Sequence, residues 1–202
     1  YQPAAVLAAA ADLDLFSTLA KGPLSAEAVA RQRACDLRGV TTLLDALTVL
    51  GLLDKQGGDY SLAPGVEGCL TADGPQSVLA MAQHQANCLR RWAQLAQVIQ
   101  SGRPAERSPS VRGEQGDLEA FIGAMDNVSA PAADDVIRAI QPLQFKHLLD
   151  VGGASGTWTA AFLRACPTCI ATLFDLPDVI PMARQRLADA GLAERVRLVA
   201  GD

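Results

Sequence analysis

The sequence of 202 residues lacks the features that mark several classes of protein. It has no apolar run close to the roughly 20 residues that a membrane-spanning helix needs, and it begins without the basic segment of a secretory signal. It also has no run rich in lysine and arginine, and its formal net charge is -5, so the electrostatic footprint of a nucleic-acid-binding protein is missing. We therefore expect a cytoplasmic protein with no membrane partner and no nucleic-acid partner.

Cysteine is scarce and unevenly spaced. The five cysteines are an odd number scattered along the chain, which favours reduced thiols over a disulfide framework. Cys166 and Cys169 have the two-residue spacing of redox and zinc motifs, but no second cysteine pair accompanies them, and His84 and His147 are distant in the sequence. We expect no metal site, and a packing role for this pair in the loop between a helix and a strand.

The last quarter of the chain has three short apolar runs, and each ends in an acidic or glycine-rich turn. The first run is followed by a glycine-rich segment at 152–156 and then by an amphipathic pattern. Glycine lets the backbone turn tightly and approach a ligand. The segment is therefore predicted to be the first strand-to-helix turn of a doubly wound α/β sheet, where ligands bind.

An acidic residue at the end of the second run supports a nucleoside-like ligand. In nucleotide-binding folds a carboxylate about 20 residues beyond the glycines binds the ribose hydroxyls, and Asp175 has this position. The dinucleotide fingerprint needs glycine at the third position of the loop, where this chain has Ala154, and Asp150 stands two residues before Gly152. This pattern argues against a dinucleotide.

Three motifs together resemble those of a known family. They are Asp-Val-Gly-Gly-Ala-Ser-Gly at 150–156, Phe-Asp-Leu-Pro-Asp-Val at 174–179 and Val-Ala-Gly-Asp at 199–202. The first resembles the leading motif of class I S-adenosylmethionine-dependent methyltransferases. The set is similar to the small-molecule O-methyltransferases of plants and bacteria, and Leu-Pro after the acidic residue is its most specific part.

The resemblance implies S-adenosyl-L-methionine as the cofactor and methyl transfer to a hydroxyl of a small aromatic or phenolic molecule. The residues that it places at the cofactor are Asp150, Gly152, Gly153, Gly156, Asp175, Leu176, Asp202 and Ser129. It places Met125 and Asp126 at the substrate. Met125 and Ser129 share a face of a predicted helix at four-residue spacing, although a methionine that fills the core and an ordinary helical serine would give the same pattern.

The N-terminal region has a different character. Apolar spacing predicts a helix around residues 13–19, a short helix capped by Ser25 and a third helix over 37–53, and Gly57-Gly58 predicts a hairpin. Together these elements predict a winged helix. Its third helix has Arg38, Thr41 and Thr42 as groups that could contact DNA, but also two aspartates, which DNA would repel. This composition favours a protein-protein module over a DNA-binding domain. The resembled family uses such a region to form a homodimer.

The middle of the chain is predicted to be helical, with helices over 78–99 and 118–140 and a mobile loop over 103–116. The expected domains are a winged-helix-like dimerisation domain (1–75), a helical linker that lines the substrate cavity (76–143) and the first part of a Rossmann-like cofactor domain (144–202). The expected fold is thus a mostly α N-terminal domain followed by an α/β methyltransferase domain with half of its sheet.

The chain departs from the family in one respect. The family supplies a catalytic histidine well beyond its Gly-Asp motif, and neither His84 nor His147 matches that position. We therefore name no catalytic base, and we expect the chain to be an incomplete part of a longer enzyme and inactive alone. Two alternatives stay open at this point: a non-catalytic homodimeric scaffold and a winged-helix regulator.

Overall fold

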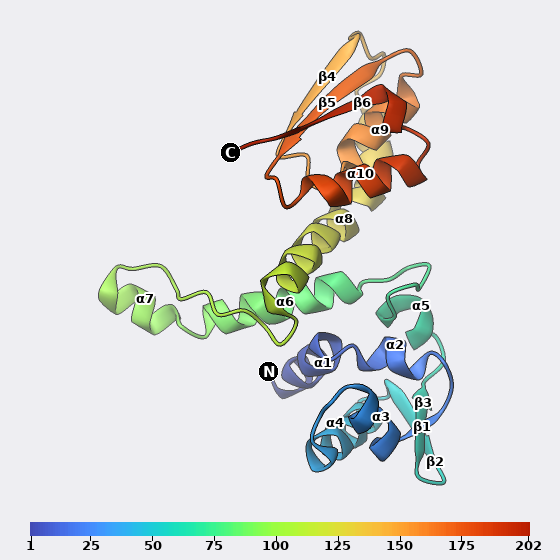
Figure 1. The fold of residues 1–202 in the computed structure, drawn as a ribbon, viewed down its shortest axis with the longest axis vertical. Coiled ribbons are helices and arrows are strands. Elements are labelled where there is room, and N and C mark those ends of the chain that lie inside the picture. Colours follow the sequence, from blue (N-terminus) through green and yellow to red (C-terminus); the bar gives the residue numbers. More distant parts are fainter. The chain divides into compact units, whose positions relative to one another are not determined.

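The computed structural model describes residues 1–202, and the chain divides into two compact units, residues 1–121 and 122–202 (Figure 1). The first unit is mostly helical and contains a small antiparallel sheet. Its elements are α1 (Gln2–Asp12), α2 (Leu15–Leu19), β1 (Leu24–Ser25), α3 (Ala26–Gln32), α4 (Leu37–Val49), β2 (Leu53–Gln56), β3 (Asp59–Leu62), α5 (Val66–Leu70), α6 (Leu79–Trp92) and α7 (Leu95–Ser101). The long helix α8 (Gly113–Ala139) begins in this unit and continues into the second.

Local sequence signals explain the helix starts and the hairpin. The Ser25 hydroxyl accepts a hydrogen bond from the Ala28 backbone N–H at 3.3 Å, which confirms the predicted cap of α3. The turn between β2 and β3 has Gly57 at φ 60° and Gly58 at φ 98°, the backbone conformation that a two-residue hairpin requires. The predicted hairpin is therefore confirmed, and β3 pairs with both β1 and β2.

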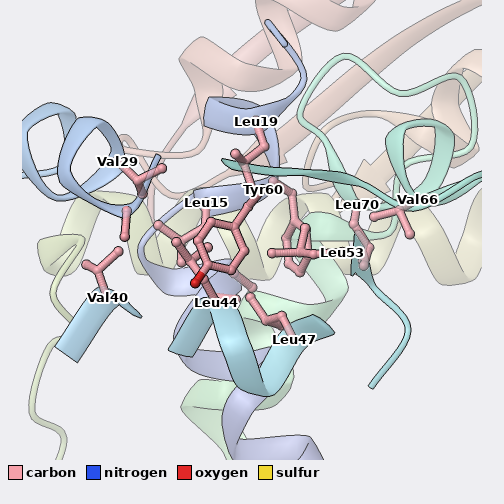
Figure 2. Packing of buried hydrophobic residues seen from close by; sticks show 14 of the residues in the cluster. Leu15, Leu19, Val29, Val40, Leu44, Leu47, Leu53, Tyr60, Val66 and Leu70 are labelled. Atoms are coloured by element: carbon pink, nitrogen blue, oxygen red, sulfur yellow. The ribbon is translucent and has the colours of Figure 1, made fainter. Parts of the chain in front are cut away.

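The core of the first unit joins its helices to the sheet (Figure 2). Leu44 and Leu47 of α4 pack with Tyr60 of β3, and all three side chains are almost fully buried. The Tyr60 hydroxyl donates a hydrogen bond to Asp45 Oδ1 at 2.7 Å, so the buried ring keeps a partner for its polar end. This core gives the winged-helix-like region its fixed shape.

Three predictions in this unit differ from the structure, and the first is that α8 begins at Gly113, within the loop predicted over 103–116. The single helix expected over 78–99 is broken between α6 and α7. The side chain of Gln94 accepts a hydrogen bond from the Glu106 N–H at 3.0 Å and donates one to the Glu106 carbonyl at 3.1 Å. These hydrogen bonds between residues 12 positions apart stabilise the end of α6 and the start of α7. Helical periodicity alone does not reveal such a contact. Helix α1 was not predicted, because its alanine-rich sequence has little amphipathic contrast.

The second unit is an α/β unit. Its sheet is parallel, in the order β4 (His147–Val151), β5 (Ile170–Asp175) and β6 (Val196–Ala200). Helices α9 (Thr157–Ala165) and α10 (Ile180–Asp189) connect the strands, with a 3-10 turn at Ala193–Arg195. Leu163, Leu173 and Leu187 form the centre of its core. The predicted order, a mostly α N-terminal region followed by an α/β region with a small parallel sheet, is confirmed.

The cysteine prediction is wrong for one pair. Cys166 and Cys169 form a disulfide, where we expected reduced thiols, while Cys35, Cys69 and Cys88 are free. The turn after α9 brings the two Cα atoms within 5.5 Å, a normal separation for a disulfide. The Arg195 guanidinium donates hydrogen bonds to the carbonyl oxygens of both residues and fixes this turn against the segment that leads into β6.

None of the helices combines the length and apolar character that crossing a bilayer would need.

Candidate functional site

The glycine-rich loop over 152–156 connects β4 to α9 in the second unit. The Gly152 N–H donates a hydrogen bond to the Phe174 carbonyl at 2.8 Å, which ties the loop to the end of β5. A Cβ on Gly153 would lie 2.6 Å from Leu173 Cγ, so no larger residue fits there without displacing the core. Gly152 has φ +71°, and a Cβ placed there would meet nothing within 4 Å. The loop therefore packs tightly on one side and stays open on the other.

Asp175 lies at the carboxyl end of β5, directly beside this loop. Its Oδ2 accepts a hydrogen bond from the Ala154 N–H at 2.7 Å, and its Oδ1 accepts one from the Leu176 N–H at 2.7 Å. Each carboxylate oxygen has room for a second donor. The structure thus brings together the glycines and the acidic residue that the sequence analysis singled out.

Two further predicted residues lie at the carboxyl ends of the neighbouring strands. Asp150 ends the apolar part of β4, and its Oδ2 accepts a hydrogen bond from the Thr159 hydroxyl at 2.5 Å. Asp202 is exposed and follows β6. The Gly201 N–H donates to the Asp175 carbonyl at 3.0 Å. All three acidic residues therefore lie at the edge where open α/β sheets bind ligands.

The predicted residues of α8 lie in the second unit as well. Met125, Asp126 and Ser129 are half-buried. The Asp126 carboxylate accepts a hydrogen bond from the Thr157 hydroxyl at 2.6 Å and pairs with the Arg186 guanidinium at 2.6 and 2.7 Å. Sequence analysis missed both partners, because they are 31 and 60 residues away and no motif links them to α8.

A separate cavity of about 540 Å³ lies within the first unit. It is lined by α6, by the segment over 106–109 and by the start of α8. His84 and Phe121 have ring centroids 5.3 Å apart at a tilt of 51°, and Leu118 adds apolar surface. The cavity also has polar groups, among them Arg91 and Gln94. A small aromatic molecule with polar substituents would suit this mixture.

Two titratable groups of the cavity, His84 and Asp117, have pKa values below their ordinary ones. Burial and the positive charge of Arg91 lower the pKa of His84, which favours a neutral imidazole able to accept or donate a hydrogen bond. Burial would raise the pKa of Asp117, but hydrogen bonds from the Ser110 side chain and backbone outweigh it, so the pKa is lowered overall. At neutral pH these shifts favour a neutral histidine and an ionised carboxylate in the cavity.

Comparison with known proteins identifies two family domains in the chain. The model of the O-methyltransferase domain matches residues 92–202, and that of the O-methyltransferase dimerisation domain matches residues 3–67. The tetracenomycin polyketide synthesis 8-O-methyl transferase of Streptomyces glaucescens is 32% identical over 204 residues, which are 97% of this chain and 60% of that protein. Acetylserotonin O-methyltransferase of Rattus norvegicus is 33% identical over 209 residues, which are 98% of this chain and 48% of that protein.

Solved structures give the same result. The mitomycin 7-O-methyltransferase is similar with a TM-score of 0.78 and 28% identity, over 98% of this chain and 62% of that one. Human N-acetylserotonin methyltransferase, solved in complex with S-adenosylmethionine, is similar with a TM-score of 0.73 and 28% identity, over 100% of this chain and 62% of that one. The chain spans about half to three fifths of the length of these relatives. With the domain model matching more than half of its residues, the chain belongs to the O-methyltransferase family.

Proposed function

We propose that this chain holds the cofactor site of an S-adenosyl-L-methionine-dependent methyltransferase that methylates a hydroxyl of a small aromatic molecule. The observation that carries the proposal is the meeting of the glycine loop and Asp175 at one edge of the sheet, with the Ala154 N–H 2.7 Å from the carboxylate. The family match supports this catalytic function over the scaffold and the regulator that the sequence left as alternatives.

The residues at this edge fit the cofactor. The carboxylate of Asp175 would accept hydrogen bonds from the ribose hydroxyls, because its oxygens keep free lone pairs after binding Ala154 and Leu176. The exposed side chain of Leu176 would pack near the adenine, and Asp202 would approach the adenine amine. On the methionine side, the contacts would come from Asp150, Gly152, Gly153, Gly156 and Ser129. When bound, the cofactor supplies an electrophilic methyl group on a sulfonium.

The cavity of the first unit supports a small aromatic acceptor. Its volume of about 540 Å³ lies within the range of roughly 300 to 1,000 Å³ of small-molecule sites. Phe121 offers an aromatic surface and the neutral His84 a hydrogen-bonding group. Relatives are described as acting on aromatic molecules, for example the 3-hydroxy-5-methyl-1-naphthoate 3-O-methyltransferase of Streptomyces sahachiroi, 27% identical over 201 residues. Met125 is a further proposed substrate neighbour, and the catalytic base stays unassigned.

A homodimer is the assembly that we propose. It is supported by the match of residues 3–67 to a dimerisation domain and by exposed apolar side chains on α4, which include Leu37 and Val49. The cytoplasmic location stays a prediction of the sequence.

The cofactor proposal is tested by calorimetric titration of the chain with S-adenosylmethionine and S-adenosylhomocysteine, with NAD as the comparison ligand. We expect binding of the first two alone. Asp175→Ala should weaken that binding by roughly tenfold or more, because it removes charge-assisted hydrogen bonds to the ribose. Asp178→Ala, three residues away and exposed, is the matched control and should bind as the unaltered chain does. Unchanged affinity in the Asp175 variant would contradict the assignment.

A further inference from the structure

We infer that Asp126 is a positioning residue that fixes the glycine loop and the start of α9 against α8, and not a group that contacts the substrate. The inference deepens the proposed function, since the loop that it fixes is the proposed cofactor site.

The contacts of Asp126 join three helices of the second unit. Thr157 is the first residue of α9 and directly follows the last glycine of the loop. Its hydroxyl donates to Asp126 Oδ1 at 2.6 Å, while Arg186 of α10 donates to Oδ2 at 2.7 Å and lies 2.6 Å from Oδ1. Both carboxylate oxygens are thus engaged by short, charge-assisted bonds. Oδ1 has two partners and Oδ2 one, and only 20% of the side chain is exposed, so the carboxylate has little surface left for a substrate.

The bond to Thr157 continues into the loop. The hydroxyls of Thr157 and Ser155 are 3.2 Å apart, and both residues are buried, with 9% and 8% of their surface exposed. A buried hydroxyl that loses its partner is costly, so this chain of bonds restrains the conformation of residues 155–157. The backbone N–H of Ala154, which binds Asp175, belongs to the same loop. Restraint at Thr157 therefore acts on the loop whose Ala154 amide holds Asp175, the residue proposed to bind the ribose.

The same carboxylate also sets the position of α8. Met125 and Ser129, the proposed substrate and cofactor neighbours, lie one residue before and three residues after it on this helix. Anchoring Asp126 to Thr157 and Arg186 therefore fixes both of them relative to the glycine loop. A preorganised loop and helix lose less conformational freedom when a ligand binds. A positioning residue thus contributes to affinity by lowering this entropic cost.

A second ion pair of α8, made with α9, provides a comparison. Asp134 of α8 lies 3.0 Å from Arg164 of α9, with 65% and 55% of the two side chains exposed. Asp126 is only 20% exposed. Exposed pairs contribute little to stability, and Asp134 does not touch the loop residues. It is therefore a matched control for a general effect of joining α8 to α9.

The test uses hydrogen-deuterium exchange of the loop amides over 152–157, measured without cofactor. Thr157→Val removes the hydroxyl and keeps the side-chain shape, and Asp126→Asn removes the charge. We expect exchange at these amides to rise by roughly tenfold in either variant, the effect of losing one charge-assisted hydrogen bond. Thr157→Ser should restore the behaviour of the unaltered chain, and Asp134→Asn should leave the loop unchanged.

The affinity for S-adenosylhomocysteine is the second readout. We expect Thr157→Val and Asp126→Asn each to weaken binding by about tenfold. The double variant Asp126→Asn/Thr157→Val should weaken binding no more than either single variant does, because the two residues act through the same contact. Exchange within twofold of the unaltered chain in the Thr157→Val variant, or an equal rise in Asp134→Asn, would overturn the inference. If the unaltered chain does not bind the ligand, the proposed function fails while the exchange comparison still decides the role of Asp126. Should Asp126→Asn not fold, Thr157→Val and Thr157→Ser decide it.

Discussion

Among single residues, His84 combines a place in the cavity of the first unit with a shifted ionisation. Burial and the charge of Arg91 lower the pKa of its imidazole, so the folded chain binds the proton less readily than the unfolded chain does. In the unfolded chain a histidine titrates near pH 6.5. The stability linked to His84 is therefore fully present above about pH 6.5 and is lost as the pH falls from there toward the lower folded pKa.

This linkage predicts that the stability of His84→Gln depends less on pH than that of the unaltered chain. Glutamine keeps a polar group of similar size and cannot take up the proton. Between pH 7.5 and pH 5.5 the unaltered chain should lose more unfolding free energy than the variant. The measurement is urea denaturation of both proteins at the two pH values. Titration of the other groups is common to both proteins and cancels in the difference. Equal losses would show that the folded chain tolerates protonated His84 as readily as the unfolded chain does.

The residues of the candidate site divide into those that sequence analysis found and those that it could not. The glycine loop and Asp175 were found because a tight turn and a strand end leave a local pattern in the sequence. Thr157 and Arg186 were missed because their contacts with Asp126 depend on how three helices pack. The family resemblance implied a substrate contact for Asp126, and only the structure shows what its carboxylate binds.

Among the elements, α1 is joined to two distant parts of the first unit through one side chain. Asp12, at the end of α1, accepts hydrogen bonds from Arg90 of α6 at 2.9 Å and from Arg112, just before α8, at 3.2 Å. Arg112 also binds Asp117 at 3.0 Å. The side chains of Asp12 and Arg112 are only 9% and 15% exposed. Asp12 and Arg112 are therefore largely shielded from water, while Arg90 is 40% exposed.

Removing Asp12 takes one of the two carboxylate partners from Arg112, which is only 15% exposed, and the carboxylate partner from Arg90. We predict that Asp12→Ala lowers the unfolding free energy of the chain by about 3 kcal/mol, as measured by chemical denaturation. The exposed pair of Asp135 and Arg138 provides the control, and Asp135→Ala should cost less than about 0.5 kcal/mol. Equal effects of the two substitutions would mean that the Asp12 network is no more than a surface feature.

The elements differ in how far the sequence predicts them. The hairpin and the three parallel strands follow from local patterns, because glycine turns and apolar runs bounded by polar residues are set within a few positions. The break after Trp92 does not, since it depends on the hydrogen bonds between Gln94 and Glu106. The disulfide of Cys166 and Cys169 likewise depends on a turn whose geometry the spacing did not reveal.

At the scale of the whole molecule, the proposed homodimer has to overcome charge repulsion. Each copy carries a formal charge of -5, so two copies repel each other at long range, and salt screens this repulsion. The attraction must then come from apolar surface. The side chains of Leu37 and Val49 on α4 are 43% and 87% exposed, and that of Leu50, directly after the helix, is 38% exposed. A groove lined by Val6, Leu43 and Ala46 lies beside the same helix. This surface belongs to the residues that match the dimerisation domain.

We predict that Val49→Asp weakens dimerisation at least roughly tenfold, because it places an unpaired charge in an apolar contact. The dissociation constant is measured by analytical ultracentrifugation across a concentration series. Ala188→Asp on α10 is the control, since it adds the same charge at an exposed helical position outside residues 3–67. The unaltered chain should also dimerise more tightly at higher salt as the repulsion is screened. An equal loss of dimer in both variants would assign the effect to net charge and not to the surface of α4.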